Sequence, residues 1–403
     1  MDGLCGQLML TQYGLVTCLG CCRCDDLECI YSQLTTRKVR NMMEVLERIE
    51  SSYFPVFKSM LMDVEAALTE ARDIHLHLMP LRRHLEAIEK AEFSKVKPLL
   101  LPLLHVVCLA WVTSQHYSVP ARLVVLLQEI CNLLIQQALA YLSPEDLLKG
   151  EMEESLGKVQ MVLSILNDFK GAFEDRREKL HTYYEPGQEV KEWDFHATMV
   201  FSRLDSFLKR LGMVEDLLTN ALDLMKLEKI EFSGIKGKAL SQQVLDVYEE
   251  FQEAYKVFAE RTYDCLDLTN TDFEQDAFDF QQKVEDIDRR LATIFIQAFD
   301  DALDLEHAFK LLYMYGSLLE RPVIAADTAD KYSVLISMFN SALNDASLIY
   351  SRHIQAELEL GSPPVHKNMP VVAGALGWAR ELRARIQAQF GCFRHITHPC
   401  VSS

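Results

Sequence analysis

The sequence predicts an all-α protein, an elongated stack of antiparallel helical bundles built from long heptad-patterned helices. Gly and Pro number only 16 and 12 among 403 residues, and the abundant Leu, Glu, Ala, Lys, Gln and Met favour helix over strand. Apolar residues recur at steps of three and four, which is the spacing of one helix face. No stretch shows the alternation that is typical of a strand.

Composition and charge limit the classes of partner. The chain carries 41 Lys and Arg against 59 Asp and Glu, a formal net charge of -18. Nucleic-acid binding needs clustered basic side chains that neutralise phosphates, so we expect no nucleic-acid partner. The same balance disfavours an anionic membrane surface, and we expect no membrane and no small-molecule substrate. A soluble protein that meets basic surfaces on other proteins is the better interpretation.

Residues 1–37 form a Cys-rich leader without sustained periodicity, which we expect to be disordered. Cys18, Cys21 and Cys24 have C-x-x-C spacings, but a structural zinc site usually pairs two such motifs across a longer loop. Here the candidate ligands are compressed into one stretch, which favours a leader over a metal site. Asp2 replaces the basic region of a signal peptide, so none is expected. The leader cysteines are Cys5, Cys18, Cys21, Cys22, Cys24 and Cys29.

The first sub-bundle of helices is expected over residues 38–180. Pro55 fits the first turn of a helix, because its missing N–H has no partner there. Pro80 and then Pro98 with Pro102 are expected to divide the segments that follow, since Pro removes a backbone donor and clashes with the preceding turn.

Two apolar segments of this sub-bundle predict buried core helices. The run 99–112 is short for a membrane span and contains Pro102 and His105. Residues 121–142 are hydrophobic nearly all round, which predicts a central position. A long helix is then expected over 145–179, loosened near its glycines.

The second sub-bundle is expected over residues 194–386, after a loop at 181–193. Residues 228–238 connect its first helix to a central hairpin, and Gly361 to Pro364 form a further break. Periodicity is lost after residue 386, so residues 387–403 are expected to be a divergent C-terminal end. The helices expected around the central hairpin cover 198–227, 331–360 and 370–386.

The central stretch, Leu240 to Leu312, carries two heptad-patterned helices. Neither helix can bury its apolar stripe alone, so we expect an antiparallel hairpin in which the stripes pack together. Docking of the stripes on a partner chain is the alternative. The stripe of the first helix is Leu240, Val244, Val247, Phe251, Ala254 and Phe258; that of the second runs from Ala277 to Ala298, with Val284, Ile287, Leu291 and Ile294 at its centre.

No motif positions a convincing catalytic group, and we expect no enzyme and no cofactor. The segment Gly234 to Ala239 has only two residues between its glycines and lacks the Ser or Thr of a phosphate-binding loop. His75, His77 and His84 do not provide the i, i+4 spacing of a metal site on one helix. We expect these histidines to be partly exposed residues of an amphipathic helix.

Acidic side chains cluster between Glu274 and Asp301, but the region lacks the Gly and the ligand spacing of a calcium loop. We expect a solvated helix face with i, i+4 pairs of Glu285 with Arg289 and of Asp286 with Arg290. Cys108, Cys131 and Cys265 stand singly in apolar contexts, which indicates a reduced, intracellular protein that uses Cys as a small hydrophobe.

Longer phrases of the sequence resemble the N-terminal tail region of axonemal dynein heavy chains, most closely the outer-arm β-type chains of motile cilia and sperm flagella. The resemblance extends from about Lys38 to Ile386. The leader and the last residues depart from the family pattern. The phrases that carry it are LLQEICNLLI (126–135), SPEDLLKGE (143–151), LEKIEFSGIKGK (227–238), VYEEFQEAYKVFAERTYDCLD (247–267), DRRLATIFIQAFDD (288–301), LEHAFKLL (305–312), GSLLERPVI (316–324) and PPVHKNMPVVAGALGWARELRARI (363–386).

The resemblance implies a share of the dynein tail, the region that joins heavy chains and carries intermediate and light chains in the arm. It implies a location in the cytoplasm and cytoskeleton, at the axoneme of a cilium or flagellum. The ATPase ring and the microtubule-binding stalk of the family have no counterpart in this sequence, so the motor activity does not transfer to it. A generic coiled-coil or helical-bundle adaptor unrelated to cilia is the alternative, since it would share the heptads but not the phrases.

Overall fold

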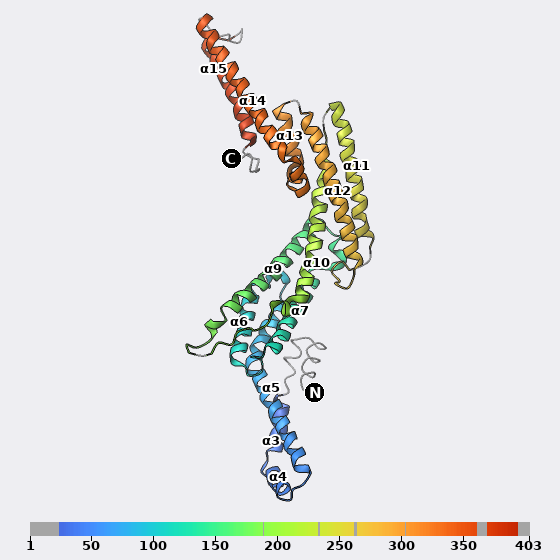
Figure 1. Cartoon of the computed structure of the whole chain (residues 1–403), viewed down its shortest axis with the longest axis vertical. Coiled ribbons are helices and arrows are strands. Elements are labelled where there is room, and N and C mark those ends of the chain that lie inside the picture. The colour runs from blue at the N-terminus through green and yellow to red at the C-terminus, as the bar shows by residue number, and fades with distance from the viewer. Residues whose placement is uncertain are drawn as a thin grey trace. The chain divides into compact units, whose positions relative to one another are not determined.

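The computed structural model describes residues 24–187, 189–232, 234–261, 264–302, 304–360 and 369–393. The regular structure of these residues is helical, as the sequence predicted, and the described part of the chain contains no strand. The chain divides into two compact units, residues 1–218 with 263–271 and residues 219–262 with 272–403. Figure 1 labels the helices, and each unit is described by itself.

Three helices form the core of the first unit: α6 (Lys97–Thr113), α7 (Pro120–Leu142) and α9 (Met152–Glu178). Both α6 and α7 pack on α9. Apolar side chains line α7 nearly all round, and those of Leu127, Ile130 and Leu134 have no exposed surface (0%). By length and composition α7 would suit a membrane span, but half (50%) of its most apolar window is buried inside the protein.

Pro80 does not divide the chain as the sequence predicted. It lies inside α5 (Tyr53–Lys90), which continues without a break. Pro in a helix interior costs about 3 kcal/mol, because a hydrogen bond is lost and the ring clashes with the preceding turn. The neighbouring Leu78, Leu81 and Leu85 are fully buried (0% exposed), so tertiary packing outweighs this local cost. Pro102 likewise lies inside α6, whereas Pro98 lies in its first turn.

The predicted helix over 145–179 is divided in two. A short helix, α8 (Pro144–Leu147), is followed by an irregular segment that contains Gly150, and α9 begins only at Met152. Leu147, the last residue of α8, and Leu148, the first residue after it, are buried at 2% and 9% exposed. Their burial fixes the chain direction just before Gly150, a residue type that is unfavourable in a helix interior. Gly157 and Gly171 lie inside α9.

The loop at 181–193 returns to the same core that it leaves. It begins with a 3-10 turn, η2 (Leu180–Tyr183), and ends at Trp193, whose ring stacks on Phe173 of α9 at 5.0 Å. The guanidinium of Arg177 donates hydrogen bonds to the carbonyl oxygens of Trp193 and Phe195, at 3.1 and 2.8 Å. The loop and the start of α10 (Ala197–Leu224) therefore belong to the first unit.

Helix begins earlier than the sequence suggested. Residues assigned to the leader form α3 (Cys24–Leu34), which packs on α5, and α4 follows (Arg37–Arg48). Glu28 of α3 pairs with Arg72 of α5 at 3.0 Å, and Tyr31 donates a hydrogen bond to Glu65 at 3.2 Å. Neither α3 nor α4 contributes a buried residue. Cys5, Cys18, Cys21 and Cys22 lie outside the described residues.

The second unit is organised around α12 (Asp272–Asp300), which packs against α11 (Gly234–Glu260) and α14 (Pro322–Leu360), as Figure 1 shows. Pro322 occupies the first position of α14, so this helix begins before residue 331, where the sequence placed it. The unit is completed by η3 (Met225–Lys229), α13 (Leu305–Tyr315), η4 (Gly316–Glu320) and α15 (Val371–Phe393). The expected break at Gly361 to Pro364 lies outside the described residues.

Gly237, in the segment that resembles a phosphate loop, has a packing role. It lies in the first turns of α11, where a Cβ atom would come within 2.8 Å of the backbone carbon of Phe232. Such a distance is shorter than real Cβ contacts, so the incoming chain can approach α11 only because residue 237 has no side chain. The amide of Phe232 also donates a hydrogen bond to Ser241 Oγ at 2.8 Å.

Candidate interaction site

The two apolar stripes of the central hairpin lie in the interior of the second unit. The residues of the first stripe and the central residues of the second are buried there, with exposed fractions of 9% or less, whereas Ala277 at the start of the second stripe is only half-buried. The two helices that carry them, α11 and α12, pack on each other. The stripe residues are Leu240, Val244, Val247, Phe251, Ala254 and Phe258 on α11 and Val284, Ile287, Leu291 and Ile294 on α12.

Aromatic rings pack together at the end of this hairpin where α11 ends and α12 begins. The ring of Phe280 on α12 lies 5.5 Å from that of Phe258 and 6.5 Å from that of Phe251, both on α11. Phe258 also meets Phe273 edge to face, at 6.3 Å. Edge-to-face pairs of this kind add to the gain from burial. With their stripes covered in this way, α11 and α12 can offer a partner only their outer faces, which are mostly polar and carry the exposed apolar side chains of Leu245, Val257 and Phe278.

Charged residues flank the packed stripes. Arg290 of α12 pairs with Glu250 of α11, and Arg261 pairs with Asp276 at 3.0 Å. The predicted pair of Glu285 with Arg289 is present at 3.6 Å. The predicted pair of Asp286 with Arg290 is wrong, because Arg290 reaches across to α11 and Asp286 pairs instead with Arg289 at 2.7 Å.

A buried ion pair joins α12 to the start of α14. Arg321, only 8% exposed, donates from Nε and from one Nη to the two carboxylate oxygens of Asp288, at 2.8 and 2.9 Å. Asp223 lies 3.6 Å from the same guanidinium and also binds Lys226 at 2.7 Å. Burial raises the pKa of Asp288, while the hydrogen bonds from Arg321 act to lower it.

Asp288 was missed as a structural residue, since the sequence analysis counted it within a solvated acidic face. It lies four residues after Val284 and three before Leu291, which places it on the buried face of α12. An acidic side chain in an apolar stripe predicts a buried cation partner. That the partner is Arg321, 33 residues away, became visible only in the folded chain.

The residue groups with possible metal or nucleophile chemistry lie apart. No group of three or more His, Cys, Asp or Glu with metal-binding geometry occurs among the described residues. His77 Nδ1 lies 3.0 Å from the Thr113 hydroxyl, a contact between neighbouring helices. Burial raises the pKa of the thiols to about 11 for Cys108 and about 12 for Cys131 and Cys265, which makes them poor nucleophiles.

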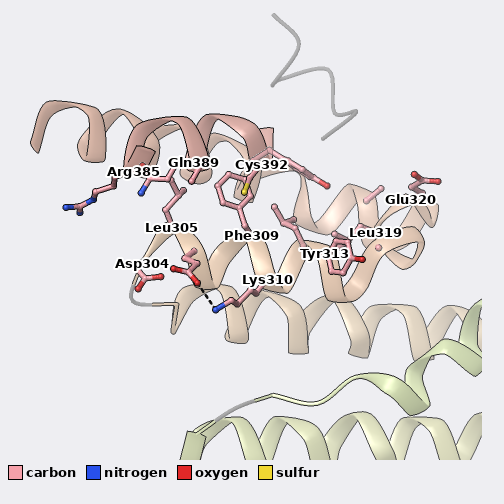
Figure 2. A pocket seen from close by; sticks show the side chains of 16 residues that line it. Asp304, Leu305, Phe309, Lys310, Tyr313, Leu319, Glu320, Arg385, Gln389 and Cys392 are labelled. Atoms are coloured by element: carbon pink, nitrogen blue, oxygen red, sulfur yellow. Dashed lines mark ion pairs between the residues drawn. The ribbon is translucent and has the colours of Figure 1, made fainter. Parts of the chain in front are cut away.

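One open groove lies in the second unit, between α13, η4 and the C-terminal half of α15 (Figure 2). Its cavity volume is about 1400 Å³. Leu305, Phe309 and Leu319 form an apolar part of its wall, and Tyr313 at its edge is 90% exposed. A hollow of this kind, with apolar walls and an exposed aromatic ring, can accommodate a partner side chain or helix.

Taken together, these features define a class of protein. The described residues form packed helices with covered stripes and an open apolar groove, and no group of His, Cys, Asp or Glu with metal-binding geometry occurs among them. These features define an all-α protein built of helical bundles.

Comparison with known proteins then gives the family. The model of the dynein heavy chain, N-terminal region 1, matches residues 22–403. The chain therefore belongs to the dynein heavy chains and represents their N-terminal region. The match is longer at both ends than the resemblance from Lys38 to Ile386, and it includes the C-terminal residues that the sequence analysis had left outside the family pattern.

The relatives in the comparison are chains of cilia and flagella. Dynein axonemal heavy chain 9 of Homo sapiens is 62% identical over 381 residues, which is 94% of this chain. The ciliary dynein beta chain of Heliocidaris crassispina is 46% identical over 377 residues, again 94% of this chain. The beta chain of the flagellar outer arm of Chlamydomonas reinhardtii is 35% identical over 368 residues, or 91%. The chain spans 8% of the length of each of these relatives.

Proposed function

We propose that this chain is a non-catalytic assembly module of an axonemal dynein heavy chain tail. In this role it associates with other dynein heavy chains and binds dynein intermediate and light chains at the arm, in support of microtubule-based ciliary movement. The observation that carries the proposal is the match of residues 22–403 to the N-terminal region of the family alone. The names of the relatives, which are axonemal, ciliary and flagellar, support a location in the axoneme.

The structure supports this role through its division between interior and surface. The packed stripes of α11 and α12 form the scaffold, so partner binding falls to the surfaces that stay open. Apolar side chains remain exposed on such surfaces: Tyr313 by 90%, Val372 by 72% and Val56 by 68%. Exposed apolar residues near charged ones are typical of protein interfaces, where apolar contacts supply affinity and charges select the partner.

The proposal includes the absence of motor activity. Residues 234–239, the only segment that we considered as a phosphate site, form the start of α11, where Gly237 packs closely on Phe232. We expect the purified chain to hydrolyse no ATP above the buffer blank, with or without microtubules. Turnover that follows the chain through purification would overturn this part of the proposal.

Affinity capture from ciliated-cell extract tests the assembly role. The full chain of 403 residues is immobilised after its helical circular dichroism spectrum has been verified, and retained proteins are identified by mass spectrometry. We expect dynein heavy and intermediate chains to be retained and to be displaced by excess free chain. A folded chain that retains chaperones alone, or no dynein subunit, would overturn the proposal.

The alternative of a helical adaptor unrelated to cilia has lost its basis. That alternative required that the ordered phrases be absent, and the phrases lie within the matched residues 22–403. The 62% identity to an axonemal heavy chain over 94% of the chain points the same way.

A further inference from the structure

The groove of the second unit has an apolar lining that the described residues leave partly uncovered: Leu305 and Leu319 are buried at 5% and 7% exposed, whereas Ala388 and Cys392 are exposed. Leu305, Phe309 and Leu319 come from α13 and η4, and Ala388 and Cys392 from α15. Tyr313 stands beside them with 90% of its surface exposed. Figure 2 shows Gln389 and Cys392 of α15 on the side that faces α13, and Arg385 directed away from it. Because apolar surface gains from removal from water, this wall favours an apolar occupant.

The groove is held open by packing at one of its walls. Phe393, the last residue of α15, meets the ring of Phe309 edge to face at 4.9 Å and that of Phe339 on α14 at 4.8 Å. These contacts fix the end of α15 against α13 and α14. A preformed site has less entropy to lose on binding than a site that must first be ordered.

Oppositely charged side chains lie at the two ends of the groove. Figure 2 shows Arg385 at one end of the groove, near the beginning of α13, and Glu320 at the other, after its end. Both side chains are exposed, and neither forms an ion pair within the described part of the chain. The other charges there are already engaged: Lys310 pairs with Glu306 at 2.8 Å, and Asp304 accepts from the His307 amide at 2.9 Å.

We propose that this groove binds one amphipathic α-helix of another dynein subunit, which lies antiparallel to α13 with its N-terminus at Glu320 and its C-terminus at Arg385. The proposal rests on the function proposed above and assigns the surface that performs part of it. An apolar stripe of the bound helix contacts Phe309, Tyr313 and Ala388.

The dimensions agree with a helix as the occupant. A helix about 10 Å across rises 5.4 Å per turn and fills about 400 Å³ per turn, so a groove of about 1400 Å³ has room for about three turns. The 11 residues of α13 extend over about 16 Å, which is also about three turns. Helix-in-groove recognition uses anchors at the spacings i, i+3, i+4 and i+7 over such a length.

The charges determine the direction of the bound helix. A helix carries a partial positive charge at its N-terminus and a partial negative charge at its C-terminus. Glu320 therefore favours the N-terminus and Arg385 the C-terminus. The dipole of α13 favours the same direction, since its own N-terminus lies at the Arg385 end (Figure 2). A helix that lies antiparallel to α13 satisfies both conditions.

Direct binding of a designed helix tests the groove. The probe is a fluorescein-labelled, hydrocarbon-stapled helix of about 14 residues with Leu at positions i, i+3, i+7 and i+10, Lys near its N-terminus and Glu near its C-terminus. A second probe has the same composition with Lys and Glu exchanged. We expect the full chain to bind the first probe about tenfold more tightly than the second, in fluorescence polarisation at low salt.

Two variants and one control locate the binding. Arg385→Glu should abolish the preference between the two probes, because a carboxylate then lies at each end of the groove, and Tyr313→Ala should weaken both by about tenfold. Arg383→Glu changes an exposed Arg of α15 that does not line the groove, and it should leave both affinities unchanged. Equal effects of Arg383→Glu and Arg385→Glu, or no preference of the unaltered chain between the probes, would overturn the proposal.

The outcome can be separated from that of the proposed function. Capture from extract is repeated with Tyr313→Ala and Arg385→Glu as immobilised chains. Loss of one dynein subunit, with the others retained, is the expected result. If every subunit is retained in full, the groove proposal fails and the assembly function stands. If the unaltered chain retains none while the probes bind as expected, the assembly function fails and the groove remains a helix-binding site.

Discussion

At the scale of single residues, the second unit depends on a buried charge. Arg321 and Asp288, at 8% and 4% exposed, form a bidentate pair that links η4 and α14 to α12. Removal of the cation leaves a carboxylate without compensation in the interior. We expect Arg321→Ala to lower the free energy of unfolding by about 3 kcal/mol or more, measured by urea denaturation with circular dichroism.

A matched control is available in the exposed pair of Arg289. Its guanidinium lies 2.7 Å from Asp286, and the Arg289 side chain is 60% exposed. Because solvent and side-chain entropy offset such surface pairs, Arg289→Ala should change the stability by less than about 0.5 kcal/mol. Equal effects of the two substitutions would contradict the assignment of Arg321 as a structural cation.

Asp73 provides a pH-dependent contribution in the first unit. Burial opposes its ionisation, but hydrogen bonds from the Ser114 hydroxyl and from the amides of His116 and Gln115 outweigh it and lower the pKa of this carboxyl. These donors lie at 2.5, 3.2 and 3.2 Å, and they fix the turn between α6 and α7.

The lowered pKa gives the sign of the pH effect. The stabilisation by ionised Asp73 is fully present above the pKa of about 3.9 of an unfolded Asp and is lost as the pH falls through the lower folded value. We expect Asp73→Asn to cost about 2 kcal/mol at pH 7, and the difference from the unaltered chain to narrow below about pH 4. Asp63→Asn, at an exposed position of the same helix α5, should change the stability at pH 7 by less than about 0.5 kcal/mol in the same denaturation series.

At the scale of elements, the contribution of a residue to the stability of the hairpin of α11 and α12 depends on the helix face that it occupies. Phe280 is 4% exposed and touches the rings of Phe251 and Phe258, whereas Phe278, two positions earlier, is 57% exposed. We expect Phe280→Ala to lower the unfolding free energy by about 3 to 5 kcal/mol, because a buried cavity is created.

Phe278→Ala removes the same atoms from the surface and should change the stability by less than about 0.5 kcal/mol. The comparison keeps the helix, the residue type and the size of the truncation constant. If both variants were equally destabilised, α12 would have to present a different face to α11 from the one described.

At the scale of the whole molecule, burial is distributed unevenly. No residue of α3 or α4 is buried, whereas α7 in the same unit buries Leu127, Ile130 and Leu134 completely (0% exposed). Elements with little buried surface open at a low free-energy cost. We therefore expect amide hydrogen exchange in α3 and α4 to be at least about a hundredfold less protected than in α7, as measured by mass spectrometry. Equal protection in the free chain would show that α3 and α4 are stabilised by contacts other than those described.

The sequence by itself determined the helical class and the buried faces of the long helices. Apolar residues three and four positions apart fix a single face regardless of what covers it, so the stripes from Leu240 to Phe258 and from Val284 to Ile294 were visible without coordinates. The ordered phrases likewise identified the family, because related proteins share residues in order and not only a composition.

Only the tertiary structure decided which surfaces meet. Pro80 remains inside α5 because Leu78, Leu81 and Leu85 are buried around it, and a local propensity cannot include this distant packing. The pairing of Asp288 with Arg321 likewise depends on tertiary packing, because the two residues are 33 positions apart in the sequence. The groove between α13 and α15 combines residues 305 to 320 with residues 385 to 392. A pattern within either segment cannot predict such a site. The two segments are brought together by tertiary packing, which neither segment encodes by itself.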